Sequence, residues 1–225
     1  MKHPSFEVIN AGICGQNSSQ LLARLESDVV MARPGLAIIG VGTNDAINSR
    51  NGVPLPLFEN NLSAMADCLA AGKIRLLFLT MPTCRDQYVL ERHAPEFFDG
   101  MSPLQRLEQY RGAVMEVANR HALPVADVFG AMKARGDLGG GLGSLLQNEE
   151  NGYARDGVHP TPQGYEFIAS IVYREMVQAG LTFGKMVCLG DSITFGMRDG
   201  VSHHSYPEGL RRLLGGLPTG NPMAL

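Results

Sequence analysis

The sequence predicts an α/β fold in which a parallel sheet is covered by helices on both faces. Short apolar runs alternate along the chain with longer amphipathic stretches, and several of the runs are apolar throughout. A continuously apolar strand is buried on both faces, as in parallel sheets whose strands are connected by helices. We find no internal repeat and no interdomain linker, so residues 1–225 are expected to form a single domain.

Five segments have the composition of strands, and two of them are apolar enough to be buried. Leu-Ala-Ile-Ile-Gly-Val at residues 36–41 is the most uniform, and Ile-Arg-Leu-Leu-Phe-Leu-Thr at 74–80 is similar to it. Their length of five to seven residues fits strands better than buried helices. The predicted strands, in chain order, are residues 6–10, 36–41, 74–80, 124–128 and 186–190.

The stretches between these strands have apolar residues near helical spacing. In one of them, Leu62, Met65 and Leu69 recur at intervals of three and four residues. The clearest helix start is Thr161 followed by Pro162, because threonine caps a helix N-terminus and proline is favoured in the first turn. The predicted helices are residues 18–32, 56–71, 103–121, 161–179 and 206–214.

Two further segments are expected to be loops. Residues 83–102 read as a long irregular segment that forms a pocket wall or lid, and residues 136–152 read as a glycine-rich, flexible flap. The glycine-rich segment has neither the G-x-G-x-x-G pattern nor the lysine of a phosphate-binding loop. The side chains proposed for the lid are Arg85, Tyr88, Phe97 and Phe98.

Charge and hydropathy exclude several classes of partner. The net charge of −3 offers no electrostatic attraction to nucleic acid or to an anionic membrane. No run approaches the roughly 18 apolar residues of a membrane span, and the N-terminus lacks the apolar stretch of a signal peptide. We therefore expect a cytoplasmic protein. The sequence does not indicate an oligomeric state.

No metal or other cofactor is expected. The four cysteines are far apart, without the spacing of a zinc site, and buried free thiols are their simplest interpretation. His203 and His204 lie near Asp199, but adjacent histidines rarely bind one ion.

Polar residues follow the predicted strands where a parallel sheet binds ligands, at the carboxyl ends of its strands. Ser192 follows the last strand and is placed as a nucleophile. Asp156 and His159 lie three residues apart in one turn, so that the carboxylate can reach one imidazole nitrogen while the other faces a serine. Each pattern alone is common in ordinary turns; together they supply nucleophile, base and orienting acid.

Two other strand ends offer donors for an oxyanion. Gly15, after the first strand, can present an unobstructed backbone N–H, and Asn44, after the second, can donate from its amide. Asp45 is expected to hold the second loop by accepting backbone N–H groups. If the Asn44 amide donates to an oxyanion, its removal should lower the rate of acyl transfer by about 10²–10³-fold.

Four segments resemble the signature blocks of the SGNH (GDSL) hydrolase family. They are residues 190–194 (Gly-Asp-Ser-Ile-Thr), 10–15 (Asn-Ala-Gly-Ile-Cys-Gly), 42–45 (Gly-Thr-Asn-Asp) and 156–160 (Asp-Gly-Val-His-Pro). The resemblance implies a three-layer α/β/α, flavodoxin-like fold with a five-stranded parallel sheet. It also implies a triad of Ser192, His159 and Asp156, and an oxyanion hole formed by Ser192 N–H, Gly15 N–H and the Asn44 side chain. An α/β-hydrolase is disfavoured because no G-x-S-x-G elbow is present.

The order of the blocks differs from that of the family. There the serine block lies near the N-terminus, whereas here Ser192 follows all the other blocks. The chain therefore resembles a circular permutant in which residues 186–225 correspond to the usual N-terminal part.

The activity implied by the resemblance is hydrolysis of short-chain carboxylic esters through an acyl-enzyme. The preferred substrate is a small ester, such as an acetylated carbohydrate. Two alternatives remain open: an acyltransferase that uses the same triad, and a non-catalytic carbohydrate-binding member of the fold.

Overall fold

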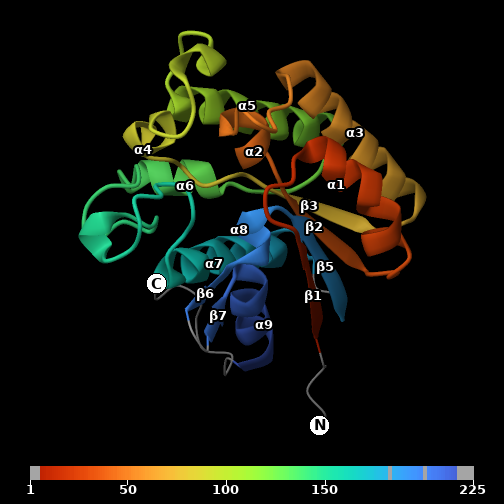
Figure 1. Cartoon of the computed structure of the whole chain (residues 1–225). Helices are drawn as coiled ribbons and strands as arrows, with labels where there is room; N and C mark the ends of the chain where they lie inside the picture. The colour runs from red at the N-terminus through yellow and green to blue at the C-terminus, as the bar shows by residue number, and fades with distance from the viewer. Residues whose placement is uncertain (1–5, 182–183, 200–201, 217–225) are drawn as a thin grey trace.

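The computed structural model describes residues 6–181, 184–199 and 202–216, and its main element is a five-stranded parallel sheet. Its spatial order is β1-β5-β2-β3-β4, so the last of these strands in sequence lies between the first two (Figure 1). The strands are β1 (Glu7–Gly12), β2 (Leu36–Gly40), β3 (Arg75–Leu79), β4 (Val125–Ala126) and β5 (Lys185–Gly190).

Helices cover both faces of this sheet. In β2, Ala37 and Ile39 pack in one core with α1, α3 and α5, whereas Leu36 and Ile38 pack in a second core with α7 and α9. Figure 1 shows these two groups of helices on opposite sides of the sheet. Both faces of β2 are thus buried, which is why its sequence is apolar without alternation. The predicted three-layer α/β/α arrangement is confirmed.

The five predicted helices are present, with ends set by local capping. Asn17 caps α1 in a reciprocal capping box with Gln20, and the Thr161 side chain accepts the Gly164 N–H at the start of α7. Residues 26–30 continue α1 as a short π-helical segment. The long helices are α1 (Ser18–Leu25), α3 (Leu55–Ala71), α5 (Pro103–Arg120), α7 (Pro162–Gln178) and α9 (Tyr206–Gly216).

The structure also contains several short elements that were not predicted from the sequence. They have three to seven residues, too few for a helical or strand period to stand out in the sequence. The fourth predicted strand is also shorter than expected, because Val128 begins a helix. These elements are α2 (Thr43–Ile47), α4 (Asp86–Leu90), η2 (Pro95–Phe98), α6 (Val128–Ala134), η3 (Glu149–Asn151), α8 (Ser192–Phe195), β6 (Met197–Asp199) and β7 (Ser202–His204).

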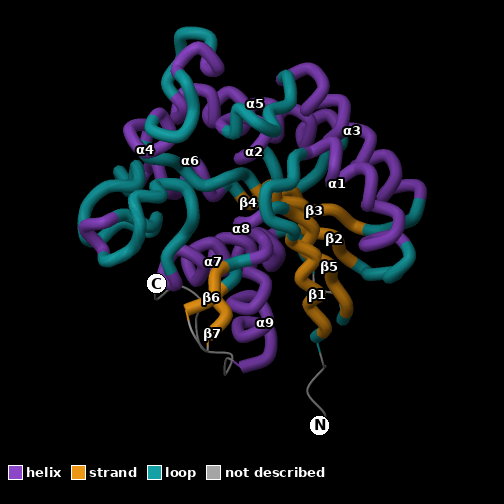
Figure 2. Tube along the Cα trace, in the orientation of Figure 1, coloured by secondary structure: helices purple, strands orange, loops and turns teal. Residues whose placement is uncertain are grey.

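The expectation of an irregular segment at residues 83–102 is wrong. The segment contains η2 and the helix α4, which is labelled in Figure 2. It buries Tyr88 and Phe98 completely, so it contributes to the core. Phe97 and Asp99 line a cavity of about 410 Å³, but Ser192, His159 and Asp156 are not among its lining residues, so the expected pocket wall or lid at the site stays a prediction.

The glycine-rich segment 136–152 is also more ordered than a flexible flap. Buried Asp137 accepts hydrogen bonds from the Ser144 hydroxyl and the Leu145 N–H, at 2.7 and 2.6 Å. Asn148, which is fully buried, donates to the carbonyl oxygens of Gly141 and Leu146. Buried side-chain amides and carboxylates therefore take the place of regular backbone pairing here.

In the part of the chain that is described, no helix is long and apolar enough to cross a membrane.

Candidate active site

The strand order explains how distant loops meet at one edge of the sheet. Because β5 lies between β1 and β2, the turn after β5 is flanked by the turns that follow those two strands. These turns carry Ser192, Gly15 and Asn44 respectively. All three predicted residues thus lie at the carboxyl edge, where parallel sheets place their ligands.

Ser192, His159 and Asp156 are linked by hydrogen bonds. His159 Nε2 lies 2.9 Å from Ser192 Oγ, and His159 Nδ1 lies 2.9 Å from Asp156 Oδ2. One ring nitrogen therefore faces the hydroxyl and the other faces the carboxylate. With Nδ1 protonated, the imidazole can accept the serine proton at Nε2.

The Asp156 carboxylate also shapes the turn that carries His159. Its Oδ1 accepts the backbone N–H groups of Val158 and His159, at 2.9 and 2.5 Å. Gly157 has a φ of +66°, a left-handed conformation that glycine adopts without strain. The i,i+3 spacing thus places carboxylate and imidazole in contact within one local turn.

The charges of Asp156 and His159 stabilise each other. Burial raises the pKa of Asp156, but hydrogen bonds and the charge of His159 outweigh it and bring this pKa to about 2. Burial lowers the pKa of His159, whereas Asp156 and Asp191 raise it, and the pKa lies above its usual value. The site therefore favours an ionised carboxylate beside an imidazole that gains a proton readily.

Gly15 and Asn44 flank the serine on either side. Gly15 is exposed, with a φ of +77° and open space around its α-carbon. The Asn44 amide donates to Gln16 O at 3.0 Å and to Asp191 Oδ2 at 3.2 Å. Both amide hydrogens of Asn44 therefore have acceptors in this conformation. An oxyanion would share one of these hydrogens with its present acceptor or would replace that acceptor.

Two buried carboxyl groups support these loops. Asp45 accepts the Ser18 N–H with both oxygens, at 2.9 and 3.2 Å, and so joins the Asn44 loop to the start of α1. Asp191 caps α8 by accepting the Ile193 N–H. Burial raises the pKa of each of these carboxyl groups to about 6.

Close packing around two glycines sets the position of α8. A side chain at Gly190 would meet Thr194 Oγ1 at 2.0 Å and Gly40 O at 2.6 Å. One at Gly12 would meet the backbone nitrogen of Phe195 at 2.1 Å. The short helix that begins at Ser192 thus rests directly on the ends of β1 and β5.

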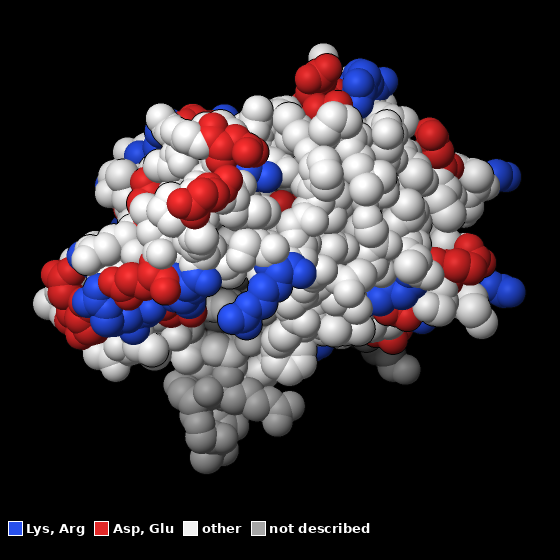
Figure 3. Space-filling model, turned by 45° about the horizontal axis from the view of Figure 1, so that its top comes forward, with Lys and Arg blue, Asp and Glu red and all other residues white. Residues whose placement is uncertain are grey.

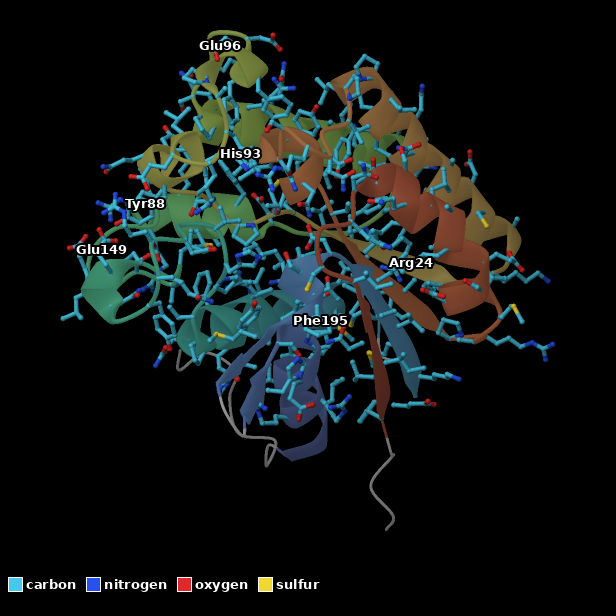
Figure 4. All side chains as sticks on the ribbon, viewed as in Figure 1. Arg24, Tyr88, His93, Glu96, Glu149 and Phe195 are labelled. Carbon is cyan, nitrogen blue, oxygen red and sulfur yellow. The ribbon has the colours of Figure 1, made fainter. Side chains whose placement is uncertain are left out.

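Arg24 and Tyr165 were not predicted from the sequence. Arg24, from α1, donates to the carbonyl of Gly190 at 2.9 Å and pairs with Asp28, so it holds the end of β5 two residues before the serine (Figure 4). Tyr165, from α7, is buried, and its hydroxyl has no hydrogen-bond partner among the described residues. A single arginine or tyrosine inside an amphipathic helix has no sequence signal that marks it as part of a site.

The described residues contain no group of three or more His, Cys, Asp or Glu side chains that could hold a metal ion. His203 Nε2 lies 2.9 Å from the carbonyl oxygen of Phe195, and the two rings meet edge to face. His203 therefore packs beside the helix that carries Ser192.

Comparison with known proteins identifies the family. A sequence model of the GDSL-like lipase/acylhydrolase family matches residues 2–167, a range that ends before Ser192. No protein of curated function matches the sequence.

Solved structures share the fold. A lipase/acylhydrolase from Enterococcus faecalis is 24% identical over 73% of this chain and 72% of that one, with a TM-score of 0.58. An acetyl xylan esterase is 22% identical over 73% of this chain and 78% of that one, with a TM-score of 0.56. A catalytic mutant of an acetylxylan esterase from Geobacillus stearothermophilus is 21% identical over 72% and 68%, with a TM-score of 0.54. The chain belongs to the GDSL-like lipase/acylhydrolase family and is a carboxylic ester hydrolase.

Proposed function

We propose that the protein is a serine esterase that hydrolyses short-chain carboxylic esters through an acyl-enzyme. The observation that carries the proposal is the continuous hydrogen-bonded series from Ser192 Oγ through the His159 imidazole to Asp156. It lies at the carboxyl edge of the sheet in a chain of an acylhydrolase family. Nucleophile, base and orienting acid are the groups that acyl transfer requires.

In the proposed reaction, Ser192 Oγ attacks the ester carbonyl while His159 Nε2 takes the hydroxyl proton. The tetrahedral intermediate expels the alcohol, which receives that proton from His159, and the acyl group remains on Ser192. Water then attacks the acyl-enzyme with His159 again as base, and releases the acid. The N–H groups of Ser192 and Gly15 and the Asn44 amide are the proposed oxyanion donors.

We propose an acetyl or similarly short acyl group, carried by a carbohydrate or another small alcohol. Two solved structures of the same fold are named as acetyl xylan esterases, which supports this choice. An acyltransferase would use the same groups and pass the acyl group to an added alcohol instead of water. Product analysis with a sugar acceptor separates these two reactions.

The decisive experiment compares the parent with Ser192→Ala on a chromogenic acetate ester and on a panel of longer acyl chains. We expect the parent to turn over the acetate and to be labelled at Ser192 by an organophosphonate. Ser192→Ala should lose both properties while keeping the thermal midpoint. Undiminished turnover in this variant contradicts the proposal, and a parent that is neither active nor labelled favours the carbohydrate-binding alternative.

We further infer that the chain is a circular permutant of the family order. Numbered from β5, the sheet order becomes 2-1-3-4-5, which is the flavodoxin-like order. The family match ends at residue 167 and leaves out the Ser192 segment. In addition, Arg211 of α9 donates to Val8 O at 2.7 Å, so the last helix lies against the first strand, as it would if the two were consecutive.

A further inference from the structure

The turn that carries Asp156 and His159 is held from outside by α4. The Arg85 N–H, at the N-cap of this helix, donates to Gly157 O at 2.9 Å. The side chains of Arg85 and Tyr88 pack so closely on Gly157 that an added methyl group would approach them to 2.8 and 3.0 Å. The beginning of α4 therefore fixes the middle of the turn.

Arg92, two residues beyond the end of α4, binds the beginning of the turn. Its Nη1 donates to Arg155 O at 3.1 Å and its Nη2 donates to Asp156 O at 2.7 Å. Three successive carbonyl groups, at residues 155 to 157, thus receive hydrogen bonds from the α4 segment, and one guanidinium supplies two of them. Guanidinium holds two acceptors in a rigid fork, whereas the ammonium of lysine is a single point donor.

The surroundings of α4 reinforce this contact. The Tyr88 ring lies between the guanidinium groups of Arg85 and Arg155, each 4.4 Å from the ring centroid. Its hydroxyl donates to Glu149, next to it in Figure 4, and Arg155 also pairs with Glu91 at 2.6 Å. Figure 3 shows acidic and basic side chains interleaved over this end of the molecule. Helix α4, which ends two residues before Arg92, is therefore itself anchored to the segment before the turn.

We propose that Arg92 is a positioning residue for the Asp156–His159 turn: by bridging the carbonyl groups of residues 155 and 156, it fixes where the Asp156 carboxylate meets the imidazole. The inference rests on the proposed serine esterase function and extends it, since Arg92 acts through the turn and not on the substrate.

The charge of Arg92 has a second, separable effect. The charged groups that act on His159 are Asp156 within its turn, Asp191 at the start of α8 and Arg92 beyond α4. The two carboxylates raise the pKa of His159, whereas Arg92 lowers it by disfavouring the imidazolium. Because the base must be neutral, loss of the Arg92 charge should move the acid limb of the pH–rate profile to higher pH.

The test compares Arg92→Gln and Arg92→Lys with the parent on the chromogenic acetate ester. For Arg92→Gln we expect kcat to fall roughly 10- to 100-fold while KM stays within about twofold of the parental value, because displaced catalytic groups slow the reaction without weakening substrate binding. We also expect the acid limb of the pH–rate profile to move to higher pH. Arg92→Lys keeps the charge but not the fork, so its acid limb should match the parent and its kcat should lie between the two. The matched control is Arg120→Gln, an exposed arginine at the end of α5, far from the carboxyl edge.

The outcomes separate this inference from the proposed function. A parental kcat in Arg92→Gln overturns the positioning role, and a parental acid limb in that variant overturns the effect of the Arg92 charge on His159. If Arg92→Gln does not fold, Arg92→Lys carries the test, and a parental kcat in that variant overturns the role as well. Absence of turnover and of Ser192 labelling in the parent would instead contradict the esterase itself.

Discussion

At the scale of single residues, the candidate site depends on how neighbouring charges set the state of His159. Asp156 contributes both a hydrogen bond and a negative charge to the imidazole, and Asp191 contributes a further negative charge. Together they outweigh burial, which alone would keep the imidazole neutral. The histidine therefore loses its proton at a higher pH than a free imidazole does.

This electrostatic arrangement predicts the pH dependence of turnover. In the parent, kcat/KM should fall as the pH drops through the raised pKa of His159, because the protonated imidazole cannot accept the serine proton. In Asp156→Asn the pKa of His159 falls, so the acid limb should move to lower pH while kcat decreases roughly 10³–10⁴-fold. A pH–rate profile of both proteins checks this. An acid limb at the same pH in both would show that Asp156 does not interact with the catalytic base.

At the scale of elements, short helices place the groups proposed to react and longer helices provide the framework. The four-residue α8 carries Ser192 and is held by contact with the ends of β1 and β5. The residues that flank the five-residue α4 hold the Asp156–His159 turn through backbone carbonyl groups, with the Arg85 N–H and the Arg92 guanidinium as donors. Helices of this length are not stable alone, so their positions depend on the strands and loops that they contact.

Two glycine substitutions separate these roles. Gly12→Ala should push α8 away from β1, since the new methyl group would lie 2.1 Å from the Phe195 nitrogen. We expect a stability loss of about 1–3 kcal/mol together with reduced ester turnover. Gly112→Ala, on the exposed side of α5 with open space around it, should instead stabilise the protein by about 0.5–1 kcal/mol and leave turnover unchanged.

Urea denaturation and the acetate assay measure both variants. Equal stability of Gly12→Ala and the parent would contradict the close packing of α8 on β1. A loss of activity in Gly112→Ala would show that turnover responds to α5 as well.

At the scale of the whole molecule, the inferred permutation implies that the sheet does not depend on the order in which the chain supplies its strands. Strands β1 and β2 both pair with β5, which is the last of the five in sequence. Side-chain burial on both faces of β5 and its backbone pairing on both edges are the same wherever the chain is cut. Breaks at exposed connections are tolerated for this reason.

A reordered chain tests the inferred permutation. Placing residues 186–225 before residue 1 moves the break from the α9–β1 connection to the α7–β5 connection. We expect this chain to fold with the same circular dichroism spectrum, to turn over the acetate ester and to be labelled at Ser192. An unfolded or unlabelled product would show that the present order of elements is required, contrary to the inference.

The local sequence pattern was sufficient to predict much of the fold and part of the candidate site. Short runs rich in apolar residues predicted the five strands, and the run at residues 36–41 is apolar throughout because both faces of β2 are buried. Thr161 and Pro162 predicted the start of α7 because capping involves neighbouring residues only. Asp156 and His159 were predicted to meet because they share one turn.

Other features depend on contacts between distant segments, which no local pattern contains. The position of β5 between β1 and β2 follows from burial and pairing across the whole chain, and it alone brings Ser192 between Gly15 and Asn44. The helical conformation of α4 and the contact of Arg92 with residues 155 and 156 also depend on distant segments. The sequence by itself therefore determined the residue types of the candidate site and its local turns. The arrangement that brings these residues together requires the packed fold, because the free energy of folding comes from burial shared among many segments.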